Sequence, residues 1–119
     1  MRTVATVLVA LVALLHVYFM VLEMFLWTKP TGRRAFGTTQ EQAEQSKTLA
    51  MNQGLYNGFL AAGLLWGLSL GAAGRSVIVF FLLCVIAAGV FGAVTANRKI
   101  LWVQALPGVV ALGALLVSR

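Results

Sequence analysis

Residues 50–61 read Ala-Met-Asn-Gln-Gly-Leu-Tyr-Asn-Gly-Phe-Leu-Ala and open a long apolar segment. Four polar side chains fall close together in this stretch: Asn52, Gln53, Tyr56 and Asn57. Inside a bilayer, polar side chains are costly unless they face protein or water. We therefore predict that the other helices of the chain are arranged around this polar turn.

The composition is typical of a membrane protein. Of the 119 residues, 61% are hydrophobic and 10% are charged, whereas about a quarter of residues are charged in soluble domains. The chain contains four apolar runs, and about 20 apolar residues are enough to cross a bilayer. We predict an all-α fold, an integral membrane antiparallel four-helix bundle, which forms a single domain over residues 1–119.

The predicted spans are separated by one long loop, residues 28–48, and two tight connections, residues 72–75 and 97–99. Connections this short make consecutive helices antiparallel neighbours. The first apolar run is too long for a cleaved signal peptide and is not followed by a small-residue cleavage site, so we predict a retained helix. The spans are expected at residues 3–27, 49–71, 76–96 and 100–117.

The long loop carries two overlapping signals for a helix start. Its first part is basic and rich in turn-forming residues, and its second part has helical composition. Thr38 followed by Glu41 fits a capping box, and Thr39 followed by Gln42 fits equally well. In both alternatives we expect the second helix to begin outside the membrane and to run directly into the span at Leu49.

The positions of Lys and Arg predict the orientation in the membrane. Of nine such residues, six lie in the long loop and the 97–99 connection, and the other three are Arg2, Arg75 and Arg119. The positive-inside rule then places residues 28–48 in the cytoplasm and both termini outside it, in a multi-pass protein of the inner (plasma) membrane. The basic residues suit anionic lipid headgroups. No basic patch interleaved with aromatic residues points to nucleic acid.

Small residues recur at helical spacing and predict close helix packing. Gly54 and Gly58 are four residues apart, and the same spacing relates Gly63 to Gly67. Without Cβ atoms, helix backbones approach closely, either within one chain or in a homo-oligomer. Pro107 lies inside the fourth span, where it removes one backbone hydrogen bond and favours a kink.

Polar side chains converge on one side of the predicted bundle. His16, Met20, Glu23 and Trp27 share one helical face because their offsets are four, seven and eleven residues. The second span enters the membrane from the side at which the first one ends, so its polar turn lies at a similar depth. The predicted ligand-binding residues are His16, Glu23, Asn52, Gln53, Tyr56, Asn57 and Gln104.

A few convergent polar groups among apolar side chains are typical of a ligand pocket. One His and one carboxylate fall short of the usual three or four metal ligands, so no metal or cofactor is predicted. We predict that the pocket binds or transports a small amphipathic or cationic molecule. The alternatives are a structural or assembly subunit that packs through its glycine faces, and an acid–base enzyme acting on a lipid-like substrate through His16 and Glu23. The sequence favours a binding protein over an enzyme.

Two segments of the chain resemble a known family. Residues 16–27, with Glu23-Met24-Phe25-Leu26-Trp27, and the segment Asn52-Gln53-Gly54-Leu55-Tyr56-Asn57-Gly58-Phe59 are similar to the signature of small bacterial membrane proteins. This family is catalogued as domain of unknown function thirteen-zero-four. The resemblance covers essentially the full chain. It implies a four-span inner-membrane protein and implies no activity.

Overall fold

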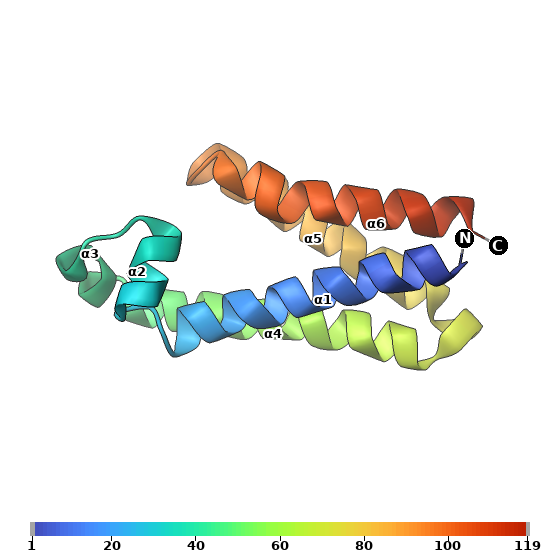
Figure 1. Cartoon of the computed structure of the whole chain (residues 1–119), viewed down its shortest axis with the longest axis horizontal. Helices are drawn as coiled ribbons and strands as arrows, with labels where there is room; N and C mark the ends of the chain where they lie inside the picture. Colours follow the sequence, from blue (N-terminus) through green and yellow to red (C-terminus); the bar gives the residue numbers. More distant parts are fainter. Residues whose placement is uncertain (1, 119) are drawn as a thin grey trace. The chain divides into compact units, whose positions relative to one another are not determined.

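The computed structural model describes residues 2–118, and every regular element in this range is helical (Figure 1). The predicted all-α class is therefore confirmed. Arg119, one of the charges counted above, lies outside the described residues. The elements are α1 (Arg2–Met24), α2 (Pro30–Phe36), α3 (Gln40–Gln45), α4 (Lys47–Ser69), the 3₁₀ helix η1 (Gly71–Gly74), α5 (Arg75–Thr95), the π-helical turn η2 (Leu101–Ala105) and α6 (Leu106–Val117).

The chain divides into two compact units, each of which is described by itself. The loop unit comprises Leu14–Ala61, and the α5–α6 unit comprises the remaining residues. Helices α1 and α4 each belong partly to one unit and partly to the other, because the boundaries fall within them.

In the loop unit, the second half of α1 packs against the first half of α4 through glycines. A Cβ atom added at Gly54 would lie 2.6 Å from Cγ of Met24 and 3.2 Å from the carbonyl oxygen of Met20. A Cβ atom added at Gly58 would lie 2.8 Å from Sδ of Met20. The predicted small-residue face of α4 is therefore in contact with α1 of the same chain.

The turn-rich first part of the long loop forms a short helix in the structure, α2. Pro30 occupies its first turn, where the missing N–H removes no helical hydrogen bond. Gly37 ends the helix with φ 66° and donates its N–H to the carbonyl of Arg33. Glycine is the residue that adopts this left-handed conformation at low cost. The same Pro and Gly that suggest a turn also mark the two ends of a short helix.

The second of the two capping alternatives is the one found. The N–H of Gln42 donates to Oγ1 of Thr39 at 3.1 Å, and the N–H of Thr39 donates to Oε1 of Gln42 at 3.0 Å. The expected continuous helix is wrong, because α3 ends at Gln45 and α4 begins at Lys47. The interruption lies at Ser46, whose hydroxyl donates to the carbonyl of Gln42 at 2.8 Å and competes with helical hydrogen bonding.

The side chain of Trp27 connects α2 with the start of α4. Its Nε1–H donates to Oγ of Ser46 at 3.1 Å, and its ring lies 4.8 Å from the ring of Phe36 between centroids. Gly32 lies against the backbone of Leu26, because a Cβ atom there would overlap the carbonyl oxygen of Leu26. The loop is therefore ordered by an aromatic contact, a hydrogen bond and a close backbone approach.

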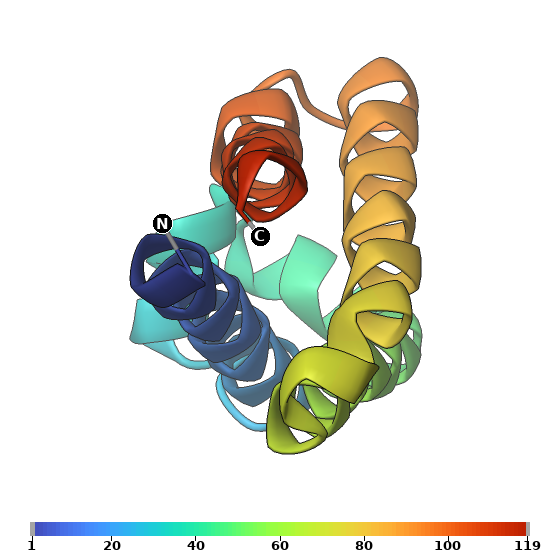
Figure 2. The ribbon, with the colours of Figure 1, turned by 90° about the vertical axis from the view of Figure 1, so that its right-hand side faces the viewer.

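In the α5–α6 unit, α5 packs along η2 and α6 (Figure 2). A Cβ atom added at Gly89 would lie 2.6 Å from the backbone nitrogen of Ala105, and one added at Gly108 would lie 3.0 Å from Cγ1 of Ile86. Arg75, at the start of α5, donates a hydrogen bond to the carbonyl of Ser118, just after α6. The two helices are therefore antiparallel and closely packed.

Pro107 is accommodated by a π-helical turn rather than by a simple kink. The N–H of Leu106 donates to the carbonyl of Leu101, five residues earlier. In an α-helix the proline ring would collide with the carbonyl four residues before it, here that of Val103. The wider turn relieves this collision, and α6 continues after it to Val117.

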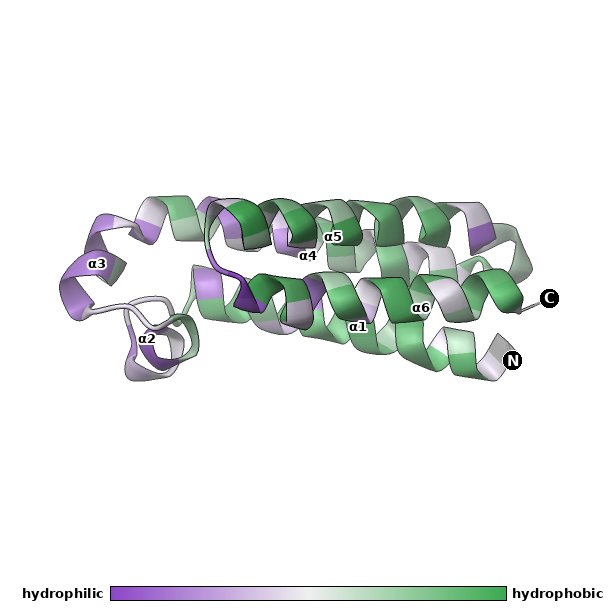
Figure 3. Ribbon diagram, turned by 90° about the horizontal axis from the view of Figure 1, so that it is seen from above, coloured by the Kyte–Doolittle hydropathy of each residue, from purple (hydrophilic) through white to green (hydrophobic). Residues whose placement is uncertain are grey.

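Two segments are long and apolar enough to cross a membrane, Thr3–Met24 with mean hydropathy 2.5 and Gly71–Thr95 with mean hydropathy 3.0. Leu101–Val117 is a shorter apolar helix. Figure 3 shows hydrophobic residues along α1, α5 and α6 and hydrophilic ones over α3. Helix α4 has the predicted length, but the polar turn at residues 52–57 lowers its hydropathy. Length and composition thus support two of the four predicted spans.

Candidate functional site

Three of the predicted ligand-binding residues are buried in the loop unit. His16 has an exposed fraction of 0%, Asn57 of 5% and Glu23 of 7%. His16 and Glu23 lie on α1, and Asn57 lies on α4. Polar and ionisable side chains are seldom buried without a hydrogen-bond partner. Of the predicted ligand-binding residues, these three are the ones that are buried.

A hydrogen bond joins the two helices at the centre of this site. Nδ2 of Asn57 donates to Oε1 of Glu23 at 2.5 Å. The bond closes because Gly54, one turn before Asn57, lets the backbones approach, and a Cβ atom there would lie 3.1 Å from Cβ of Glu23. The glycine therefore brings the two helices close enough for the short Asn57 side chain to reach the carboxyl group.

The carboxyl group of Glu23 has spare acceptor capacity. Its two oxygens together accept about four hydrogen bonds, and Asn57 supplies one of them. No ion pair to Glu23 is found among residues 2–118. A buried carboxyl group with a neutral amide partner and no counter-charge is suited to hold a proton or to accept a cationic group.

His16 lies two helical turns before Glu23 on the same face of α1. Seven residues correspond to a rise of about 10 Å. The imidazole makes an edge-on contact with Phe19, with ring centroids 5.4 Å apart and an interplanar angle of 72°. His16 is thus buried, with the ring of Phe19 against its imidazole.

The other three polar residues of α4 are not brought to this site. Asn52, Gln53 and Tyr56 are exposed, Tyr56 by 56%. The inward face of the helix is marked by its buried positions, Ala50, Gly54, Asn57 and Ala61. At about 100° per residue, Asn52 and Tyr56 lie on the opposite side. The stripe of small residues along α4 would have identified Asn57 as the inward-facing polar residue of this turn.

Gln104 lies in the α5–α6 unit, which also contains a cavity. Gln104 is half-buried in the π-helical turn η2. A cavity of about 250 Å³ is lined by residues of α1, α4, η1, α5 and α6, among them Arg75, and by none of the predicted ligand-binding residues. Arg75 was not among the predicted site residues. It lies in a short connection between two predicted spans, where an arginine predicts the orientation in the membrane and not a binding site.

Metal binding has no cluster to support it in the described part of the chain. Among residues 2–118, no three His, Cys, Asp or Glu side chains lie close enough together to hold a metal ion. Cys84 is a free, half-buried cysteine.

The comparisons with known proteins agree with the sequence resemblance. The model of a family described as "Protein of unknown function (DUF1304)" matches residues 10–116. The chain belongs to this family. The chain is also similar to the uncharacterized protein YpaA of Lactococcus lactis subsp. lactis (strain IL1403), with 34% identity over 113 residues, which cover 92% of this chain and 95% of that protein. No solved structure matches the chain. Family membership therefore supplies no activity.

Proposed function

We propose that this DUF1304 protein is a multi-pass inner-membrane protein that binds a small cationic or amphipathic molecule at the buried carboxyl group of Glu23. In this proposal residues 1–119 form one transmembrane domain, a four-helix bundle with spans near residues 3–27, 49–71, 76–96 and 100–117. The observation that carries the binding role is the buried Glu23–Asn57 pair without a cation among the described residues.

The exposure of the apolar helices supports the membrane location. In the most apolar parts of Thr3–Met24 and Gly71–Thr95, 28% and 22% of the residues are buried. The core helix of a soluble protein would be mostly buried. Large apolar side chains instead face outward, including Phe91 with 71% and Val94 with 81% exposed. Apolar surface of this extent is expected to be covered by lipid or by another protein.

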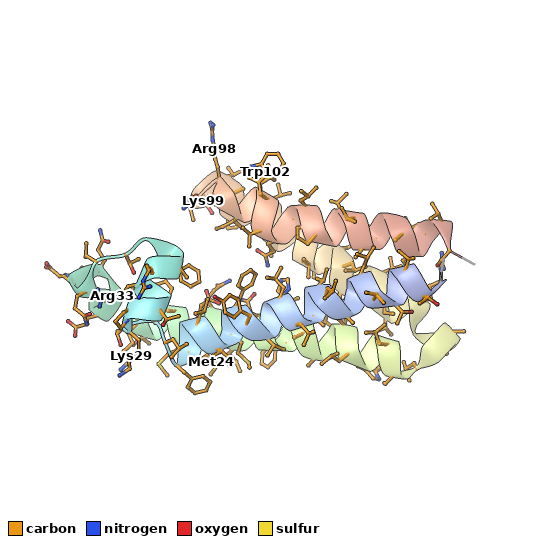
Figure 4. The ribbon with its side chains drawn as sticks, in the orientation of Figure 1. Met24, Lys29, Arg33, Arg98, Lys99 and Trp102 are labelled. Atoms are coloured by element: carbon orange, nitrogen blue, oxygen red, sulfur yellow. The ribbon has the colours of Figure 1, made fainter. Side chains whose placement is uncertain are left out.

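The proposed orientation follows from the basic residues. Lys29 and Arg33 belong to the α2 end of the loop unit, and Arg98 and Lys99 project from the connection between α5 and η2 (Figure 4). With alternating spans, both groups lie on the cytoplasmic side and both termini lie outside the cytoplasm.

This orientation is tested with reporter fusions in a bacterial inner membrane. We expect alkaline phosphatase, which is active only outside the cytoplasm, to be active when fused after Ser118 and inactive when fused after Gly37. Green fluorescent protein fused at the same two positions should give the opposite pattern. An active phosphatase at Gly37 would reverse the orientation, and activity at both positions would contradict the four-span threading.

Ligand binding is tested by thermal unfolding of the purified protein followed by tryptophan fluorescence. Tetraphenylphosphonium, a hydrophobic cation, should raise the melting temperature of the wild type by about 10 °C when present at about 100 times its dissociation constant. Glu23→Gln should lose this shift, because the amide carries no charge but still accepts a hydrogen bond from Asn57.

Glu41→Gln is the matched control, because it removes the same charge from an exposed position in α3. It should keep the full shift, and so should Asn52→Ala, whose side chain is exposed. An equal shift in the wild type and in Glu23→Gln would remove the proposed site. A loss of the shift in Glu41→Gln as well would point to general surface electrostatics.

The two alternative functions differ in their support. His16 and Glu23 are both buried on one face of α1, which favours an acid–base enzyme acting on a lipid-like substrate as the second candidate. An assembly subunit that packs through glycine faces has less support, because Gly54, Gly63 and Gly89 contact side chains or backbone of this same chain. A homo-oligomer would therefore have to form through other surfaces.

A further inference from the structure

The α5–α6 unit contains a cavity of about 250 Å³, which lies near the start of α5 and the end of α6. Its wall combines apolar side chains with a few polar groups. The lining residues that matter here are Thr6, Leu68, Arg75, Ile78, Leu115 and Ser118. Arg75 is the charged member of this set. The cavity is thus an apolar space with one cationic group at its edge.

The guanidinium group of Arg75 is held by neutral partners. It donates to the carbonyl oxygens of Ser118 at 3.2 Å and of Leu116 at 3.4 Å, and to Oγ of Ser118 at 3.5 Å. Hydrogen bonds from a guanidinium group to an anionic oxygen are typically about 2.7–2.9 Å long. Arg75 therefore has a fixed position but no partner of opposite charge among these contacts.

The α5–α6 unit contains no Asp or Glu. The three acidic residues of the chain, Glu23, Glu41 and Glu44, all belong to the loop unit. Arg75 is half-buried, and a buried charge is costly unless it is paired. A bound anion would give the guanidinium group a partner of opposite charge.

Capping of α6 is the simpler explanation of the Arg75 hydrogen bonds. A cation near the last carbonyls of a helix is favourable, and it accounts for the contacts with Leu116 and Ser118. It does not account for the adjoining cavity. A guanidinium group has five N–H donors in a planar fork, so the donors not used for capping are available to a second group.

We propose that this cavity binds the phosphate group of an anionic phospholipid, with Arg75 as the recognition residue. Arginine suits phosphate because its planar fork binds two oxygens at once. The cavity has room for a headgroup, and the acyl chains would lie along the exposed apolar side chains of Leu70, Leu116 and Val117. The proposal rests on the membrane location proposed above but is independent of Glu23.

The test measures lipid binding to the full-length protein in a mild detergent by native mass spectrometry. Dioleoyl phosphatidylglycerol should bind about tenfold more tightly than dioleoyl phosphatidylcholine, the ratio expected for one added charge-assisted interaction. Arg75→Gln should reduce this preference to nearly one. Arg98→Gln, which removes an exposed arginine of the same unit, should retain it.

Three further arms make the result decisive. Thr6→Trp should weaken binding of phosphatidylglycerol by blocking the cavity while Arg75 stays in place, and it decides the matter if Arg75→Gln does not fold. Glu23→Gln should keep the lipid preference, which separates this site from the proposed function. An unchanged preference in both Arg75→Gln and Thr6→Trp would overturn the proposal. Displacement of the lipid by inorganic phosphate at equal concentration would overturn its lipid part and identify a site for free phosphate.

Discussion

Gly89→Ala is expected to lower the free energy of unfolding by about 2–3 kcal/mol, as overpacking of a close contact does. The new Cβ atom would lie 2.6 Å from the backbone nitrogen and 2.8 Å from the Cβ atom of Ala105. Backbone atoms of η2 have no alternative rotamer, so α5 and η2 would have to separate. The measurement is a denaturation curve in mixed detergent micelles, followed by circular dichroism.

Gly113→Ala is the matched control for this prediction. It makes the same substitution in the interior of α6, but nothing lies within 4 Å of the added Cβ atom. We expect a neutral effect or a gain of about 0.5–1 kcal/mol from the higher helix propensity of alanine. Equal losses in Gly89→Ala and Gly113→Ala would show that the approach of α5 to η2 is not the cause.

Asn57→Leu is expected to lower the free energy of unfolding by about 2–3 kcal/mol. Leucine has a similar size but donates no hydrogen bond. The carboxyl group of Glu23, which is 7% exposed, would lose the amide that donates to it. Leaving a buried polar group without its partner costs more than the hydrogen bond contributes when formed. The same denaturation measurement applies.

Two comparisons isolate this interaction. Asn52→Leu changes an exposed asparagine on the same helix and should leave stability within about 0.5 kcal/mol of the wild type. In a double-mutant cycle, the variant with both Glu23→Leu and Asn57→Leu should lose less free energy of unfolding than the two single variants together. The reason is that neither polar group of the pair then remains buried without its partner. Strict additivity would mean that the Glu23–Asn57 bond does not contribute to stability.

The local helix signals of the long loop were readable from the sequence, but their interpretation depended on context. Pro30 and Gly37 bound a short helix, although the same residues also fit turns. The choice between the Thr38 and Thr39 caps needed the structure, since both spacings satisfy the motif. The Ser46 hydroxyl, which accepts from Trp27 and donates to Gln42, separates α3 from α4. That long-range contact leaves no trace in a local pattern.

The candidate site was predicted in part. Offsets of seven residues placed His16 and Glu23 on one face of α1, and both are buried. Asn57 was included with its neighbours Asn52 and Tyr56 because the helical period relates positions within α4 but does not say which face meets α1. The close approach at Gly54 and Gly58 settles that question, since backbones meet where no Cβ atom intervenes.

The sequence by itself determined the helical class, the positions of the long apolar helices and the presence of ionisable groups within them. Hydropathy and the spacing of apolar residues predict these features, because each feature depends only on residues within the same helix. The tertiary structure alone decided that Glu23 pairs with Asn57, that Gly89 lies against η2 and Gly108 against α5, and that Arg75 reaches the end of α6. Each of these contacts joins residues more than fifteen positions apart, and their partners are chosen by the packing of whole helices.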